Sequence, residues 1–187
     1  MTSSISLERL AEISSGTVIG DASTTVGSCG LNSATLPPGG LFAALPGTRV
    51  HGARYAADTA AAAILTDPEG QRILAEAGET RPLLVVEDIR AILGHVSAEI
   101  YGHPTEKLTI LGVTGTSGKT TTSYLLEAGL LHAGLSVGLI GTTGTRINRE
   151  PVPTSLTTPE APTLQELFAR MVDEGVTHVV MEVSSHA

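Results

Sequence analysis

The sequence predicts an α/β fold in two parts, a small N-terminal α/β domain followed by the first part of a domain built on a parallel sheet. Strand-like apolar segments alternate with segments of helical periodicity along the 187 residues, and such alternation is typical of parallel sheets with crossover helices. Hydrophobic residues make up 41% of the chain and charged residues 16%. This balance supports a packed core and excludes wholesale disorder.

Strands and helices alternate more clearly in the second part of the chain. Its predicted strands are 108–115, 136–142 and 177–185, and its predicted helices are 119–134 and 158–175. The strands are continuously apolar, which favours a sheet covered on both faces. The polar, proline-rich segment 143–159 is expected to be a loop or a short hairpin.

Apolar residues recur at helical spacing in both of these helices. In the first helix they are Tyr124, Leu125, Ala128, Leu131 and Leu135. In the second they are Leu164, Leu167, Phe168, Met171 and Val172.

The first hundred residues alternate less cleanly. Strands are expected over 24–32, 40–47, 61–67 and 82–88. Helices are expected over 6–13, 52–61, 68–78 and 89–102. Glycine, proline and charges gather in 102–108, so we expect a domain over 1–102, a linker over 103–107 and a second domain over 108–187.

Charge and cysteine content exclude several classes of protein. The net charge of −8 and the aromatic content of 3% argue against a nucleic-acid partner. Cys29 is the only cysteine, which excludes an internal disulfide and suits a reducing cytoplasm. The N-terminus does not resemble a secretory signal, and no apolar run approaches ~18 residues. We therefore expect a cytoplasmic protein without a membrane partner.

The segment GVTGTSGKTTT, residues 112–122, resembles a phosphate-binding loop but is shorter than the common G-x-x-x-x-G-K-[ST]. Val113 stands where the first glycine of that motif belongs, so the loop starts at Gly115. A strand precedes it and a helix follows it, which is the context that phosphate binding requires. The alternative is a glycine turn beside a surface lysine.

On the phosphate-loop reading, Lys119 reaches the β- and γ-phosphates of a nucleotide and Thr120 binds Mg²⁺. Glu182 lies in an apolar strand, where a carboxylate is costly unless it is paired or metal-bound. Its place near the carboxyl end of that strand predicts a magnesium ligand, the alternative being an edge residue facing water. Ser184 and His186 follow at the strand exit, and His186 is expected to line the site rather than to catalyse.

Two further segments carry weaker signals. Thr157 and Thr158 precede a helix, where threonine is a common N-cap, and they are alternatively donors to an anionic substrate. In the first domain, the turns and hydroxyls of 30–55 include Arg49 and give no clear signal by themselves.

Four segments together resemble the Mur ligases. They are GVTGTSGKTTT, TSLTTPEAPTLQ, VVMEVSSHA and the N-terminal LFAALPGTRVHGARYA. The resemblance covers essentially the whole chain, and the short loop is the variant of this family and of the related folylpolyglutamate synthetases. Within the family, the N-terminal segment and MEVSSH are most similar to the branch that adds the third residue of the peptide.

The resemblance implies an ATP-dependent ligase acting on UDP-N-acetylmuramoyl-L-alanyl-D-glutamate through an acyl phosphate. The amino acid added is meso-diaminopimelate or L-lysine, and similarity to actinobacterial-type relatives favours the first. The uridine-nucleotide domain is then 1–102, and the ATP-binding domain starts at 108.

The resemblance also assigns roles to individual residues. ATP is bound by Gly115, Thr116, Ser117, Gly118, Lys119, Thr120 and Thr121, with Thr120 and Glu182 on Mg²⁺. The UDP-sugar peptide contacts Leu31, Ser33, Thr48, Arg49, Val50, Thr157, Thr158 and Ser184. The chain departs from the family pattern at 32–34, where relatives often have Asp-Ser-Arg, and at Ser117, where many have Asn.

Family members have three domains, so the chain is expected to be a fragment without ligase activity of its own. By this resemblance it would lack the region of a modified lysine and the domain for the incoming amino acid. Other interpretations are a folylpolyglutamate synthetase, a nucleotide-binding module without chemistry, and a small-molecule kinase. A uridine nucleotide titration separates the Mur ligase interpretation from the nucleotide-binding module, because only the ligase has a UDP-sugar site. The kinase is disfavoured by the missing glycine at 113.

Overall fold

The computed structural model describes residues 4–153 and 159–183. The chain divides into two compact units, Met1–Gly102 and His103–Ala187. The residues expected to be a linker belong to the second unit, where Pro104–Lys107 form a 3-10 helix, η2. This short helix contacts α5 (Ala161–Asp173) of the same unit.

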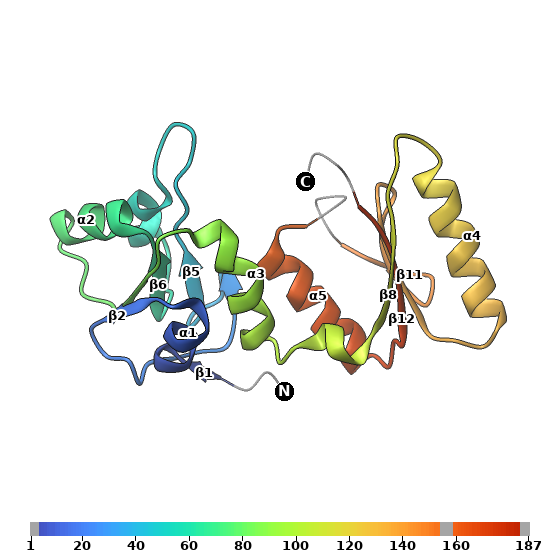
Figure 1. Ribbon diagram of the computed structural model, residues 1–187, viewed down its shortest axis with the longest axis horizontal. Coiled ribbons are helices and arrows are strands. Elements are labelled where there is room, and N and C mark those ends of the chain that lie inside the picture. The colour runs from blue at the N-terminus through green and yellow to red at the C-terminus, as the bar shows by residue number, and fades with distance from the viewer. Residues whose placement is uncertain (1–3, 154–158, 184–187) are drawn as a thin grey trace. The chain divides into compact units, whose positions relative to one another are not determined.

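The first unit contains a five-stranded sheet in the order β2-β7-β6-β5-β4 (Figure 1). Its strands are β2 (Thr17–Ile19), β4 (Cys29–Gly30), β5 (Leu41–Ala43), β6 (Ala63–Thr66) and β7 (Leu83–Val85). β4 to β7 are parallel to one another, and β2 joins β7 antiparallel. The connecting helices are α1 (Leu7–Ser14), η1 (Gly52–Asp58), α2 (Pro68–Glu76) and α3 (Ile89–Ile100).

Most elements expected in the first unit are confirmed, with three differences. The strand expected over 24–32 is wrong as one element, because the chain pairs twice, through β3 (Thr25–Val26) with β1 (Ile5–Ser6) and through β4 with β5. Residues 52–58 form a 3-10 helix rather than an α-helix. β1 and β2 were not expected, because segments of two or three residues carry no readable period.

The core of the first unit lies on both sides of this sheet. Phe42, Ile64 and Leu83 pack with Ile73 and Leu74 of α2. Successive side chains of a strand point to opposite faces, so Leu41, Leu65 and Leu84 point to the other face, where they are fully buried.

The second unit contains a sheet in the order β11-β10-β9-β12-β8. Its strands are β8 (Thr109–Val113), β9 (Val137–Gly141), β10 (Gly144–Ile147), β11 (Glu150–Val152) and β12 (His178–Glu182). β12 lies between β8 and β9 and is parallel to both, which confirms the expected parallel pairing. Of the two alternatives for 143–159, the hairpin is confirmed, since β10 pairs antiparallel with β9 and β11.

Helices cover both faces of this sheet, with α4 (Lys119–His132) on one side and α5 on the other (Figure 1). Val179 and Met181 pack with Phe168 on the α5 side. Leu139 and Val180 pack on the α4 side.

Two expectations about this unit are wrong. Leu125 is 69% exposed, and Leu126 packs against the sheet in its place. β8 is not covered on both faces in the described part of the chain, where it is the end strand of the sheet and Ile110 is 38% exposed.

Cys29 provides a natural probe for opening of the first unit. The side chain is buried, and this burial raises the pKa of its thiol to about 12. The thiolate is the reactive form, so the folded protein is expected to resist thiol reagents at neutral pH and to react when the unit opens.

We predict opposite effects for two glycine substitutions in this unit. A Cβ at Gly52 would lie 2.9 Å from the backbone N and O of Leu45, so Gly52→Ala should destabilise the unit by about 1–3 kcal/mol. A Cβ at Gly94 in α3 would meet nothing within 4 Å, and Gly94→Ala should stabilise the unit by about 0.5–1 kcal/mol. Labelling of Cys29 in mild urea should be faster in the first variant and slower in the second. Equal rates would contradict both assignments.

Candidate functional site

The glycine-rich loop between β8 and α4 has backbone angles that favour glycine. Gly115 has a φ of +138° and Gly118 a φ of +77°, values that other residues rarely adopt. Gly118 is the N-cap of α4 and places no side chain over the start of the helix. The first N–H groups of a helix attract anions, so the exposed loop 114–118 leads into a phosphate-type site.

Lys119 is the first residue of α4, and its side chain folds back over the loop. Its Nζ donates a hydrogen bond to the Gly115 carbonyl oxygen at 2.8 Å. The ammonium group is therefore held beside the loop backbone, where it adds positive charge to that of the helix terminus.

Glu182 ends β12 and is only 1% exposed. Alternation along the strand places its side chain on the same face as Val180, which is the α4 face. There the Thr120 hydroxyl donates to Glu182 Oε2 at 3.2 Å. The Thr142 hydroxyl donates to the same oxygen at 3.1 Å.

Gly141 makes room for this carboxylate. A Cβ at position 141 would lie 2.4 Å from Glu182 Oε1. Glycine at the last residue of β9 therefore lets the carboxylate occupy this position beside the end of β12.

The three oxygen-bearing side chains form one cluster, because the hydroxyls of Thr120 and Thr142 are also 3.0 Å apart. A carboxylate with two hydroxyl groups is an oxygen donor set, the kind that Mg²⁺ prefers. Within 4–153 and 159–183, no group of three His, Cys, Asp or Glu side chains is arranged to hold a metal. The residues present therefore fit a magnesium ion completed by phosphate oxygens and water.

A hollow of about 410 Å³ lies beside this cluster. It is lined by Thr120, Thr121, Tyr124, Leu125 and Thr143. The Tyr124 hydroxyl lies 2.7 Å from the Thr143 hydroxyl, so the two are hydrogen-bonded.

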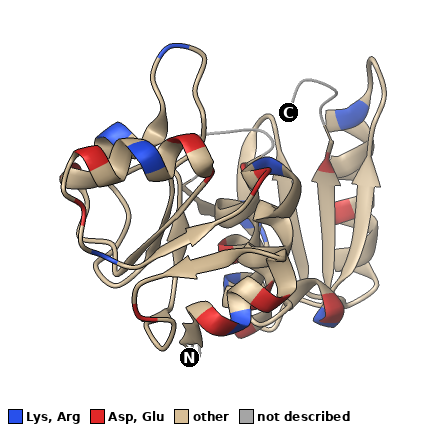
Figure 2. Cartoon of the chain, turned by 60° about the vertical axis from the view of Figure 1, so that its left-hand side comes forward, with Lys and Arg blue, Asp and Glu red and all other residues tan. Residues whose placement is uncertain are grey.

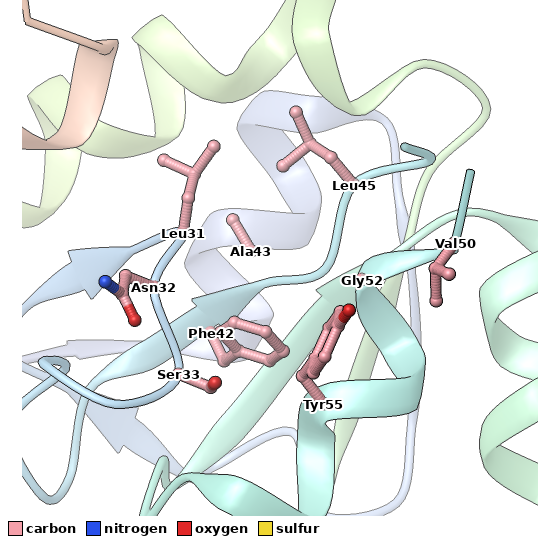
Figure 3. Close-up of a pocket in the computed structure, with 9 residues that line it drawn as sticks. All are labelled: Leu31, Asn32, Ser33, Phe42, Ala43, Leu45, Val50, Gly52 and Tyr55. Atoms are coloured by element: carbon pink, nitrogen blue, oxygen red, sulfur yellow. The ribbon is translucent and has the colours of Figure 1, made fainter. Parts of the chain in front are cut away.

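The first unit has a separate cavity of about 360 Å³ at the carboxyl ends of β4 and β5. Figure 3 shows the Phe42 and Tyr55 rings between the segment Leu31–Ser33 on one side and Val50 on the other. The carboxyl ends of parallel strands are the usual place for a ligand in an open α/β sheet. The walls are mainly apolar, with Asn32 and Ser33 as polar groups.

The structure brings together some of the predicted substrate residues and not others. Leu31, Ser33 and Val50 line the cavity of the first unit. Thr48 and Arg49 are exposed on the loop between β5 and η1 and are not among its lining residues. Four further candidates lie outside the described residues, namely Thr157, Thr158, Ser184 and His186.

Sequence reasoning missed several residues of both sites. No sequence pattern identified Thr142 as a site residue, because its role depends on β9 lying beside β12. Tyr55 and Phe42 could have been singled out from the sequence because aromatic rings of their kind are rare. The whole chain contains only three tyrosines and two phenylalanines. Two of these five rings line one cavity.

Charged residues lie mainly on helices and loops, while most strand ribbon is uncharged (Figure 2). A carboxylate in the buried strand β12 is an exception that requires a reason, and the oxygen cluster supplies one. No helix in the described part of the chain is long and apolar enough to cross a membrane.

Comparison with known proteins gives consistent results. Residues 113–187 match the family described as Mur ligase middle domain. Over 166 residues the chain is 66% identical to the UDP-N-acetylmuramoyl-L-alanyl-D-glutamate–2,6-diaminopimelate ligase of Corynebacterium glutamicum, a match that spans 87% of this chain and 32% of that protein. The enzyme of the same name from Streptomyces coelicolor is 50% identical over 188 residues, 98% of this chain and 37% of that protein.

A solved structure of a ligase of this name has the same fold. It superposes with a TM-score of 0.78 at 24% identity and covers 98% of this chain and 37% of that chain. The chain thus spans about a third of the length of the curated relatives that it matches. Its loop, its buried strand carboxylate and these matches agree, and the chain belongs to the Mur ligase family.

Proposed function

We propose that the chain is part of an ATP-dependent ligase that adds meso-diaminopimelate to UDP-N-acetylmuramoyl-L-alanyl-D-glutamate during synthesis of peptidoglycan precursors in the cytoplasm. The observation that carries the proposal is the contact between Thr120, at the start of α4, and the buried Glu182. That contact joins a phosphate-type loop to a magnesium-type oxygen cluster. The names of the relatives support the substrates and favour diaminopimelate over L-lysine.

In this proposal residues 108–187 begin the ATP-binding domain. The loop Gly115–Thr121 holds the phosphates through its backbone and the terminus of α4. Lys119 neutralises charge that develops on the γ-phosphate, and Thr120 and Glu182 hold Mg²⁺. The bound ion supplies further neutralisation of phosphate charge.

The reaction proposed here is the one that the resemblance to the Mur ligases implies. The substrate carboxylate attacks the γ-phosphorus, ADP leaves, and an acyl phosphate forms; the amine of the amino acid then displaces phosphate. Thr157, Thr158 and Ser184 are proposed contacts of the substrate, and His186 is proposed to line the site.

Residues 1–102 are proposed to bind the uridine diphosphate of the substrate. Leu31, Ser33 and Val50 line a cavity whose exposed Tyr55 ring suits a flat base. Thr48 and Arg49, exposed on the adjoining loop, are proposed to contact the diphosphate. No nucleic-acid or membrane partner is proposed.

The first test of this proposal is a UDP titration of the chain followed by NMR. Signals of Leu31, Ser33 and Val50 should shift at millimolar UDP. If no signals around the cavity shift, the result would instead favour a nucleotide-binding module without a UDP-sugar site.

The second test uses the two lysines of the chain, Lys107 and Lys119. Lys119→Ala should weaken ADP binding to the chain, and in the longer ligase it should reduce turnover by about 10²–10³. Lys107→Ala, in the 3-10 helix η2, is the matched control and should change neither. Turnover above about a tenth of wild type in Lys119→Ala would contradict the assigned role.

The third test concerns the space that Gly141 leaves for Glu182. Gly141→Ala should displace the carboxylate, because the added Cβ would lie 2.4 Å from Oε1. Calorimetric titration should then show loss of the Mg²⁺-dependent part of ADP binding. Gly112→Ala on β8 is the control, since its Cβ would meet only Val183 at 3.6 Å. Equal Mg²⁺ dependence in both variants would count against the magnesium site.

A further inference from the structure

A partly buried ion pair lies in the second unit, where the Arg146 side chain is 24% exposed. Arg146 on β10 and Glu127 on α4 form this pair, and Glu127 is only 4% exposed. Arg146 faces α4 because it pairs in register with Leu139, a residue of the α4-side core. The guanidinium carbon of Arg146 also lies 4.3 Å from the centre of the Tyr124 ring.

A contribution to stability does not by itself explain why Arg146 and Glu127 are paired at this position. Burying the Glu127 carboxylate costs desolvation that attraction to the partly exposed Arg146 often fails to offset. Among the residues that the structure describes, Glu127 Oε1 and Arg146 Nε are buried without a hydrogen-bond partner. A pair of this kind is better explained by the geometry that it imposes on its neighbours.

The neighbour on which it acts is Tyr124. Glu127 fixes the Arg146 guanidinium, which stacks on the Tyr124 ring and limits its movement. The Tyr124 hydroxyl is thereby aimed at Thr143, 2.7 Å away. The preceding residue, Thr142, is the one whose hydroxyl contacts both Thr120 and Glu182.

We propose that Tyr124, held by the Glu127–Arg146 pair, is a positioning residue for the cation site. It fixes the turn Thr142–Thr143 so that the Thr142 hydroxyl orients the Glu182 carboxylate. Groups that orient a metal ligand in this way commonly tune metal affinity. The inference rests on the proposed function only where it concerns Mg²⁺; the restraint on the turn does not depend on it.

The decisive variant is Tyr124→Phe, which removes the hydroxyl and keeps the ring under Arg146. One hydrogen bond corresponds to about a fivefold effect. We therefore expect the Mg²⁺ concentration needed for half-maximal ADP binding to rise about fivefold. ADP binding in the presence of EDTA should stay unchanged, because the loop is intact. A purely structural role would weaken ADP binding in both conditions.

Thr143→Val removes the other side of the same hydrogen bond and should have the same effect. The double variant should then be no worse than either single variant, since both changes break one interaction. Thr122→Val is the matched control, an exposed threonine of α4 outside the loop and the cluster, and it should behave as wild type. Additive effects in the double variant would overturn the proposal.

Hydrogen exchange without any nucleotide separates this inference from the proposed function. The amides of residues 142–144 should exchange about fivefold faster in Tyr124→Phe than in wild type or Thr122→Val. If the exchange rates of these amides are unchanged, the positioning role of Tyr124 is wrong, whatever Mg²⁺ dependence the titrations show. Faster exchange in a chain that fails to bind ADP with Mg²⁺ would support the restraint and reject the nucleotide function.

Discussion

The second unit depends on one constraint, the burial of the Glu182 carboxylate at the end of the central strand β12. An ionised group in an apolar environment is costly unless other groups hydrogen-bond to it or a metal binds it. The hydroxyls of Thr120 and Thr142 reach it from two different segments. This requirement links the start of α4, the end of β9 and the end of β12, so that three segments distant in sequence meet at one point.

The same constraint explains the residue types around the carboxylate. Gly141 leaves space for the carboxylate, because a Cβ there would force Glu182 to shift. Gly118, in a left-handed conformation, lets α4 begin with Lys119 and Thr120 directed at the site. The loop proposed to bind phosphate and the strand proposed to bind a cation therefore share one set of local requirements.

The sequence predicted those features of this site that have a local signal. Glu182 was recognisable because a carboxylate in an apolar strand is unusual, and the loop because its glycines and lysine occur in a fixed order. Thr142 was not recognisable, because its role depends on the order β9-β12-β8, which arises from pairing over long separations. Leu125 was placed wrongly for a related reason. Apolar residues occupy adjacent positions 125 and 126, and periodicity alone does not decide which of them meets the sheet.

The first unit was predictable to a smaller extent. Its strands are two to four residues long, too short to show a period. Its cavity combines the segment 31–33, the end of β5 and the 3-10 helix η1, which only the parallel pairing of β4 and β5 brings together. Family resemblance supplied Leu31, Ser33 and Val50, whereas Tyr55 is identified by the fold.

Both units place their candidate sites where parallel strands end, yet the two sites differ in chemistry. The cavity of the first unit has aromatic and aliphatic walls with few polar groups, which suits recognition of a flat, uncharged base by shape. The site of the second unit presents backbone N–H groups, an ammonium and clustered oxygens, which suit phosphate charge and a divalent cation. An apolar surface selects a ligand by its shape, whereas positively charged groups stabilise the negative charge that develops during phosphoryl transfer. The physical character of each site is therefore consistent with the roles proposed above, selection of the substrate in the first unit and its activation in the second.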